Sequence, residues 1–409
     1  DAKLLSNIGR YYFEVEKYDQ AIALHQKAII QAYPDFNDLD VYSLPGFDQV
    51  RQESWMMTAP QKKGEALFAR FQKSGNINDL KHAAKCFELG QLAAEEIRRS
   101  YRSDASKVYL GEYGYPGVEL AIAVNATLYE ETKESLYLQQ IFRWVERSRA
   151  SVLAESIERG RNTQLLSIPD YLVDKERELR QTLIALRSQK EQNLNAIDSV
   201  QSDYTSLNRN LQSNYPDWEK YLSSFYPLSL DQLQEKLNDS KATMLMYFWG
   251  EENLYALHID RKELKLKVLN NTKRIEFEIQ EFLQFFGSRN EISNQPLAFA
   301  RKANDLYQTL GLNDLLSGQG DIWVIPDGPL SFIPFESLLT ASTSANDPAT
   351  WPYLFLDYNI RMGASASTIA RRYRSVNAGK IFALAPLFLE NERGLSALTE
   401  SEKEVRSWQ

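Results

Sequence analysis

Residues 321–339, DIWVIPDGPLSFIPFESLL, constrain the fold of this chain more than any other stretch. The apolar run 322–325 predicts a short strand that is buried on both faces. Pro326, Gly328 and Pro329 then predict a turn, since proline fixes φ and glycine tolerates positive φ. A buried strand that leads into such a turn is typical of α/β domains, which place loops at the carboxyl edge of a sheet.

The neighbouring segments predict a mixed sheet flanked by helices. Two apolar segments joined by four polar residues predict a β-hairpin, and an alternating segment predicts a third, more exposed strand. The expected strands are 242–249, 254–259, 264–269, 322–325, one near Asn359 and one near Ile381; the expected helices are 274–286, 296–310 (with Gly311 as its C-cap), one from Ser365 and one from Thr399. An antiparallel start followed by alternating strands and helices favours a mixed sheet.

The first part of the chain predicts pairs of antiparallel helices. Helix pairs are expected at 5–34, 64–101 and 118–160, with the last turn near 136–140 and an irregular segment at 35–60. Gly9 and Ala21 are small where the first two helices should approach each other closely. Tetratricopeptide repeats recur at about 34 residues, because two helices cannot bury their apolar faces without neighbours.

A narrow apolar seam at 170–212 predicts an antiparallel helical hairpin that bends near 198–202, with a single long helix as the alternative. A short amphipathic helix is expected at 228–237. The fold class is therefore α+β and multidomain: helical repeats at 1–165, a helical hairpin or linker at 166–226, and an α/β region with a mixed sheet at 227–409.

Charge and composition exclude some classes of function. The net charge is −8 without a block of lysine and arginine, so binding to nucleic acid is not expected. One cysteine among 409 residues excludes an internal disulfide framework and favours a reducing compartment, here the cytoplasm. No apolar run reaches the roughly 18 residues of a membrane helix. Because the sequence starts at Asp1 and stops within a predicted helix, we expect it to be part of a longer protein.

Two histidines and the cysteine of the predicted repeats invite a catalytic interpretation. His82 and Cys86 are four residues apart on a predicted helix and could form a dyad or half of a metal site. A structural interpretation is favoured, because cysteine often serves as a small buried hydrophobe and no third ligand is near in the sequence. His25 stands where an aromatic residue is usual in such repeats, which favours packing.

The carboxylates of the predicted sheet region offer a second candidate site. Asp327, Glu336 and Asp357 could act as paired carboxylates in acid–base chemistry. The structural interpretation makes Asp327 a turn residue and Glu336 a partner of backbone groups at the sheet edge. His258 is expected to point outward into solvent. Gly318, Gly320 and Gly328 lack the spacing of a phosphate-binding loop. We therefore predict no catalytic residue, cofactor or metal.

Three segments resemble the CHAT family, which joins caspase-like domains to tetratricopeptide repeats. The first carries a proline, a glycine and a proline–phenylalanine–glutamate box, at Pro326, Gly328, Leu330, Pro334, Phe335, Glu336, Leu338 and Leu339. The second runs from 353 to Ser365, Ala366 and Ser367, and the third covers 383–386 and 395–408. The run Glu146–Arg147–Ser148–Arg149–Ala150 resembles the signature that closes the repeat arrays of these proteins.

This resemblance implies a caspase-like cysteine peptidase whose repeats bind a protein or peptide partner. The family's histidine–glycine and serine–alanine–cysteine motifs lie downstream of the matched segments, and this sequence contains neither. No histidine follows His258 and no cysteine follows Cys86, so we expect the chain itself to lack peptidase activity. The alternative is a non-catalytic scaffold with a degenerate domain; a carboxylate hydrolase built on Asp327 and Glu336 ranks third. An incomplete sheet leaves an unpaired edge, from which we expect self-association.

Overall fold

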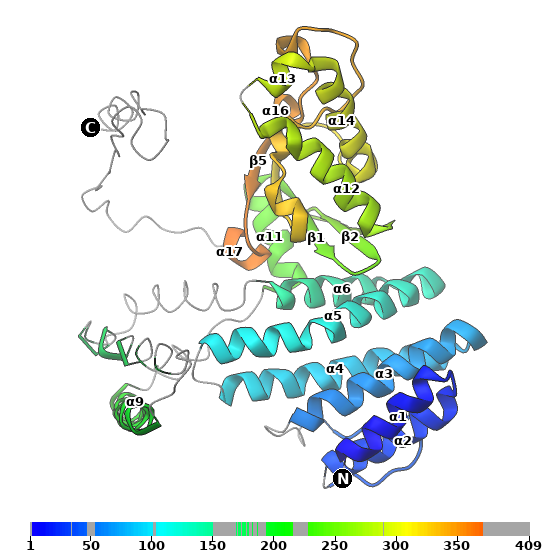
Figure 1. Ribbon diagram of the computed structural model, residues 1–409, viewed down its shortest axis with the longest axis vertical. Helices are drawn as coiled ribbons and strands as arrows, with labels where there is room; N and C mark the ends of the chain where they lie inside the picture. Colours follow the sequence, from blue (N-terminus) through cyan, green and yellow to red (C-terminus); the bar gives the residue numbers. More distant parts are fainter. Residues whose placement is uncertain are drawn as a thin grey trace. The chain divides into compact units, whose positions relative to one another are not determined.

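The computed structural model describes residues 2–33, 35–46, 54–100, 104–149, 194–215, 228–288 and 290–370, together with scattered residues between 169 and 186. The described part has an α+β fold that is mostly helical with a small mixed sheet of five strands (Figure 1). The strand expected near Ile381 and the helix expected from Thr399 lie outside the described residues, as does the chain from 150 to 168.

The first six helices form three successive antiparallel pairs, which we call the helical array. The pairs are α1 (Ala2–Glu14) with α2 (Tyr18–Ala32), α3 (Ser54–Ser74) with α4 (Ile77–Ser100), and α5 (Asp104–Thr132) with α6 (Ser135–Ser148). Each helix packs on the next along the chain. Gly9 must be small, because a Cβ atom there would lie 2.7 Å from Cε1 of the buried His25. Three helix pairs are thus present, as predicted, and His25 has the predicted packing role. The second and third pairs begin at Ser54 and Asp104, earlier than the predicted 64 and 118, and the predicted end of the third pair at 160 lies outside the described residues.

The predicted irregular segment 35–60 is wrong in its last part, because α3 already begins at Ser54 and contains Pro60. Inside a helix, a proline nitrogen cannot donate to the carbonyl four residues earlier, which here belongs to Met56. The hydroxyl of the buried Tyr33 donates to the Met56 carbonyl oxygen at 2.8 Å. A donor from the residue that follows α2 therefore helps α3 to accommodate its proline.

The turn of the third helix pair lies near 136–140, as predicted, at Lys133 and Glu134, with Lys133 in the left-handed conformation at φ 58°. A second predicted turn is misplaced. The predicted bend at 198–202 is wrong because α9 (Leu194–Asn214) runs through it. Its buried Tyr204 donates a hydrogen bond to Glu176 at 3.0 Å.

The sheet is mixed, as predicted. Its strands are β1 (Ala242–Trp249), β2 (Asn253–Ile259), β3 (Leu264–Asn270), β4 (Gly320–Ile325) and β5 (Tyr358–Met362), in the order β3-β2-β1-β4-β5. The β1–β2 and β2–β3 pairs are antiparallel, whereas β1–β4 and β4–β5 are parallel. The carboxyl ends of β1, β4 and β5 therefore share one edge, which we call the carboxyl edge.

Helices cover both faces of the sheet. One face packs on α12 (Thr272–Leu283), α14 (Pro296–Thr309) and α15 (Leu312–Leu315). The other face packs on α11 (Leu230–Ser240) and α17 (Ala366–Ala370) and belongs to the same hydrophobic cluster as α5 and α6. This cluster joins buried side chains of the array to buried side chains of the sheet, among them Ile141, Phe142, Val145, Met244, Met246, Phe248, Trp323 and Ile325. The array is thus part of the layer that covers the sheet.

We predict that Tyr33→Phe lowers the free energy of unfolding by about 1 kcal/mol, because it removes the donor to the Met56 carbonyl. Chemical denaturation followed by circular dichroism measures this change. Tyr11→Phe is the matched control, since Tyr11 is 61% exposed and should tolerate loss of its hydroxyl. Equal stability of the two variants would show that the Tyr33 hydroxyl does not help α3 to accommodate Pro60.

Candidate functional site

Glu146, in the last turn of α6, is completely buried and accepts two hydrogen bonds from another part of the chain. Its Oε2 atom accepts from the Ala366 amide at 2.9 Å, and its Oε1 atom accepts from the Ser367 amide at 2.8 Å. The first amides of a helix have no acceptor within that helix, and these two begin α17. The array therefore supplies the acceptors that the start of α17 lacks.

The start of α17 is fixed by local contacts as well. Ser365 and Thr368 cap each other: the Thr368 amide donates to Ser365 Oγ at 3.1 Å, and the Ser365 amide donates to Thr368 Oγ1 at 3.0 Å. Ser367 Oγ accepts from the Leu228 amide at 2.8 Å. Glu146 thus contacts a helix start that is already well defined by its own sequence.

Arg149 makes the second contact, to the turn that follows β4. Its Nη1 atom lies 2.5 Å from Oδ1 of Asp327, and the side chains of Arg149 and Asp327 are only 9% and 18% exposed. The other carboxylate oxygen of Asp327 accepts from the Trp249 amide at the end of β1, at 2.6 Å. Gly328 allows this turn, because it has φ +52° and a Cβ atom there would lie 3.1 Å from the Trp249 ring.

These groups form one site, which we call the array–sheet contact: Glu146, Arg149, Asp327 and the amides of Trp249, Ala366 and Ser367. It lies at the carboxyl edge, since Trp249 ends β1, Asp327 follows β4 and Ala366 follows β5. Glu119 of α5 adds a neighbouring contact, accepting from the Glu251 amide in the β1–β2 turn at 2.5 Å. Three carboxylates therefore connect helices of the array with loops of the sheet.

Burial controls the electrostatics of this site. It raises the pKa of Glu146, although hydrogen bonds from Ser367 and Ala366 and the charge of Arg149 favour the ionised carboxylate. It also raises the pKa of Glu119, where the hydrogen bond from the Glu251 amide acts in the opposite direction. Removing one partner of a buried ion pair leaves an uncompensated charge in the interior, which strongly destabilises a protein.

The structure does not bring together the carboxylates that were considered for acid–base chemistry. Asp327 lies at the carboxyl edge, in the predicted turn, and is also an ion-pair partner. Asp357 precedes β5 and therefore lies at the opposite edge of the parallel strands, where it accepts from Gln319 at 2.9 Å. Glu336 is exposed, which does not fit its predicted role as a partner of backbone groups.

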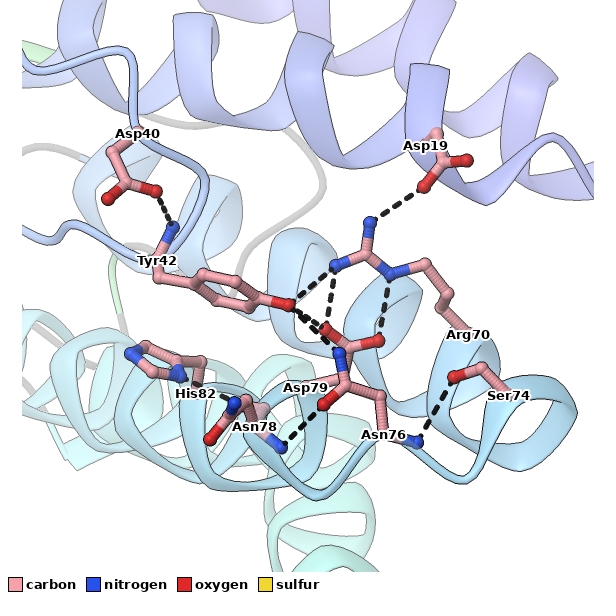
Figure 2. Close-up of polar contacts among 9 residues, drawn as sticks. All are labelled: Asp19, Asp40, Tyr42, Arg70, Ser74, Asn76, Asn78, Asp79 and His82. Carbon is pink, nitrogen blue, oxygen red and sulfur yellow. Dashed lines mark hydrogen bonds and ion pairs between the residues drawn. The ribbon is translucent and has the colours of Figure 1, made fainter.

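His82 belongs to a polar network that holds residues 35–46 against α3 and α4 (Figure 2). At its centre, the buried Asp79 carboxylate accepts from Arg70 at 2.6 and 2.8 Å and from the Tyr42 hydroxyl at 2.6 Å. The Tyr42 ring packs on His82 with 4.5 Å between ring centroids, and His82 Nδ1 lies 2.8 Å from the Asn78 carbonyl oxygen. This geometry supports the structural interpretation of His82.

Cys86 and the other two histidines are buried. Burial raises the pKa of the Cys86 thiol to about 11, the opposite of what a thiolate nucleophile needs. It lowers the pKa of His25 to about 4 and also lowers that of His258. The prediction that His258 points into solvent is wrong: it is 6% exposed, because helices cover both faces of β2.

Among the described residues, no cluster of three or more histidine, cysteine and carboxylate side chains is arranged to hold a metal ion. Within the same residues, no helix is long and apolar enough to cross a membrane. Comparison with known proteins finds no family model that matches the chain and no significantly similar curated protein.

Sequence reasoning singled out the members of the array–sheet contact separately but did not predict that they meet. Glu146 and Arg149 belong to the run at the end of the array, Asp327 to the turn after β4, and Ala366 and Ser367 to the start of the following helix. The available signal was an acidic and a basic residue, three positions apart, in the run that closes the array.

We predict strong energetic coupling between Arg149 and Asp327 in a double-mutant cycle. Arg149→Ala and Asp327→Ala should each lower the free energy of unfolding by about 3–5 kcal/mol, with a coupling of about 1–3 kcal/mol between them. The matched control is the exposed pair of Arg143, in α6, and Glu88, which are 3.9 Å apart. For this pair we expect a coupling energy of at most about 1 kcal/mol. Additive effects for Arg149 and Asp327 would exclude a stabilising ion pair.

Proposed function

We propose that the helical array binds a protein or peptide partner and that the array–sheet contact transmits this event to a caspase-like region of CHAT type. The observation that carries the proposal is that Glu146, in the last turn of α6, and Arg149, directly after this helix, hold the segments that follow β5 and β4. In open α/β sheets, functional loops lie at the carboxyl ends of the strands. These two segments are such loops.

The array has the architecture that such a role requires. Stacked helix pairs form extended surfaces that bind peptides or helices. A partner that prefers one arrangement of the array shifts the population of any region whose structure depends on that arrangement. Because α6 contacts both the sheet core and its carboxyl edge, a change at the array can reach that edge through direct contacts.

Under this proposal the parent protein is a regulated cysteine peptidase, and the chain described here is inactive by itself. If the chain is of CHAT type, as its resemblance to that family implies, the catalytic histidine and cysteine follow the segments matched here. Cys86 cannot take that role, because it is fully buried and its pKa is raised. The nucleophile and its base would therefore come from residues that follow Gln409 in the parent protein.

A non-catalytic scaffold is the second candidate. It is favoured by the engagement of the polar groups at the carboxyl edge, where Asp327 is bound to Arg149 and to the Trp249 amide. A fixed carboxyl edge suits a protein whose array and sheet present one rigid binding surface.

A thiol-directed activity-based probe separates the two candidates in a longer protein that includes the residues after Gln409. We expect the probe to label a downstream cysteine and not Cys86, and Arg149→Ala to change the labelling rate at least tenfold. Arg143→Ala should leave the rate unchanged, because Arg143 lies on α6 outside the array–sheet contact.

The Cys86→Ala variant should be labelled by the probe at the same rate as the unchanged parent protein. Labelling of Cys86 together with substrate turnover would overturn the proposal. A parent protein without a downstream cysteine would leave the scaffold as the better account.

A further inference from the structure

Residues 35–46 follow α2 and cross the second helix pair without forming a helix or a strand, and we call them the strap. The strap is exposed on its outer side, at residues 35 and 37–40. On its inner side, Tyr42 and Leu44 pack on the hydrophobic clusters of the array. Lifting the strap would therefore uncover a surface of the array without displacing a helix.

Side chains of two helices hold the backbone of the strap. Gln26 Nε2, in α2, donates to the carbonyl oxygens of Asp38 at 2.7 Å and of Ser43 at 3.3 Å. Lys63 Nζ, in α3, donates to the same Ser43 carbonyl at 3.0 Å and to Gln26 Oε1. When a protein binds a peptide, contacts to the main chain supply affinity, and pockets for side chains supply specificity.

Tyr42 occupies a pocket that uses every hydrogen-bonding position of its hydroxyl group (Figure 2). The hydroxyl donates to the buried Asp79 carboxylate at 2.6 Å, and its oxygen accepts from Arg70 Nη2 and Asn76 Nδ2, both at 3.3 Å. The ring packs on His82. A phenylalanine would fit the same space but could not make these hydrogen bonds, so the pocket selects tyrosine.

Lys63 is unusual because it is completely buried and donates to uncharged oxygens. Lysine is almost never fully buried unless it is paired. Burial lowers the pKa of Lys63, and the strap residues Asp40 and Asp38 act in the opposite direction. The chain carries acidic residues and no basic one between Lys27 and Arg51. The charge of the strap is thus complementary to the lysine that holds it.

We propose that the strap occupies a peptide-binding groove of the array and that a partner binds by displacing it. The groove, which we call the strap groove, is formed by Gln26, Lys63, Arg70, Asp79 and His82. The partner is an extended peptide with the chemistry of the strap: acidic residues, then a tyrosine for the pocket, then a carbonyl for Lys63. This inference rests on the proposed function, since it names the site and the autoinhibition of partner binding by the array.

A fluorescent peptide of residues 35–46 is the probe, and fluorescence anisotropy measures its binding to three forms of the chain. We expect binding to a chain in which a glycine–serine linker of equal length replaces residues 37–44. We also expect binding to the Tyr42→Ala chain, whose tyrosine pocket is empty. A tethered segment competes at an effective concentration of about 1 mM, so the unchanged chain should bind the peptide at least tenfold more weakly than both.

The neighbouring Lys62 and Lys63 provide a matched control, because replacing either one removes one positive charge. In the linker chain, Lys63→Met should weaken peptide binding at least tenfold. Lys62→Met should change it less than twofold, because the Lys62 side chain is 43% exposed and pairs with Glu65. A peptide with Tyr42→Phe should bind at least fivefold more weakly, since it cannot donate to Asp79.

Circular dichroism shows which variants keep their helix content, and the Tyr42→Ala chain decides the test if the linker chain unfolds. A folded variant that does not bind the peptide would overturn the proposal. Equal losses for Lys62→Met and Lys63→Met would also overturn it, because they indicate unspecific attraction between charges. If the peptide does not bind but Arg149→Ala still changes the labelling of the downstream cysteine, the strap groove is wrong and the proposed function stands.

Discussion

The buried carboxylate of Glu146 is the constraint on which the arrangement of array and sheet depends. A carboxylate without solvent contact is tolerated only when hydrogen-bond donors or a cation compensate for the lost hydration. The donors are the Ala366 and Ser367 amides, and Arg149 contributes positive charge nearby. Because the acceptor belongs to the array and the donors, about 220 residues later in the chain, begin the helix that follows β5, the array and the sheet region satisfy each other's polar groups.

The hydrophobic cluster and the array–sheet contact act together. Apolar side chains of α5, α6 and the sheet form one cluster, whose contacts stabilise the packing but do not fix one orientation. The hydrogen bonds of Glu146 and the ion pair of Arg149 fix the orientation, because their geometry fits only one position of α6 relative to β1, β4 and α17. A partner that moves α6 must therefore break the polar contacts or move the carboxyl edge with it, and either outcome links the array to the loops after β4 and β5.

Local patterns predicted the elements of the fold better than its contacts. The β-hairpin, β4 and the helices on either side follow from alternation, apolar runs and proline–glycine turns. Pro60 was assigned to an irregular segment because the Tyr33 hydroxyl that donates to the Met56 carbonyl comes from a distant position, directly after α2. His258 was predicted to be exposed because alternation assumes one solvated face, whereas helices cover both faces of β2. Glu146 and Ala366 are 220 residues apart, and no local pattern pairs such positions.

Native-state hydrogen exchange tests most directly whether array and sheet form one cooperative unit. The account predicts that the most protected amides of α6 and those of β1 and β4 open with the same free energy. It also predicts that Glu146→Ala lowers these opening free energies together, whereas Glu134→Ala, an exposed change just before α6, leaves them unchanged. If α6 opens at a lower free energy than the strands, and Glu146→Ala affects α6 alone, the array and the sheet are independent and the central claim is wrong.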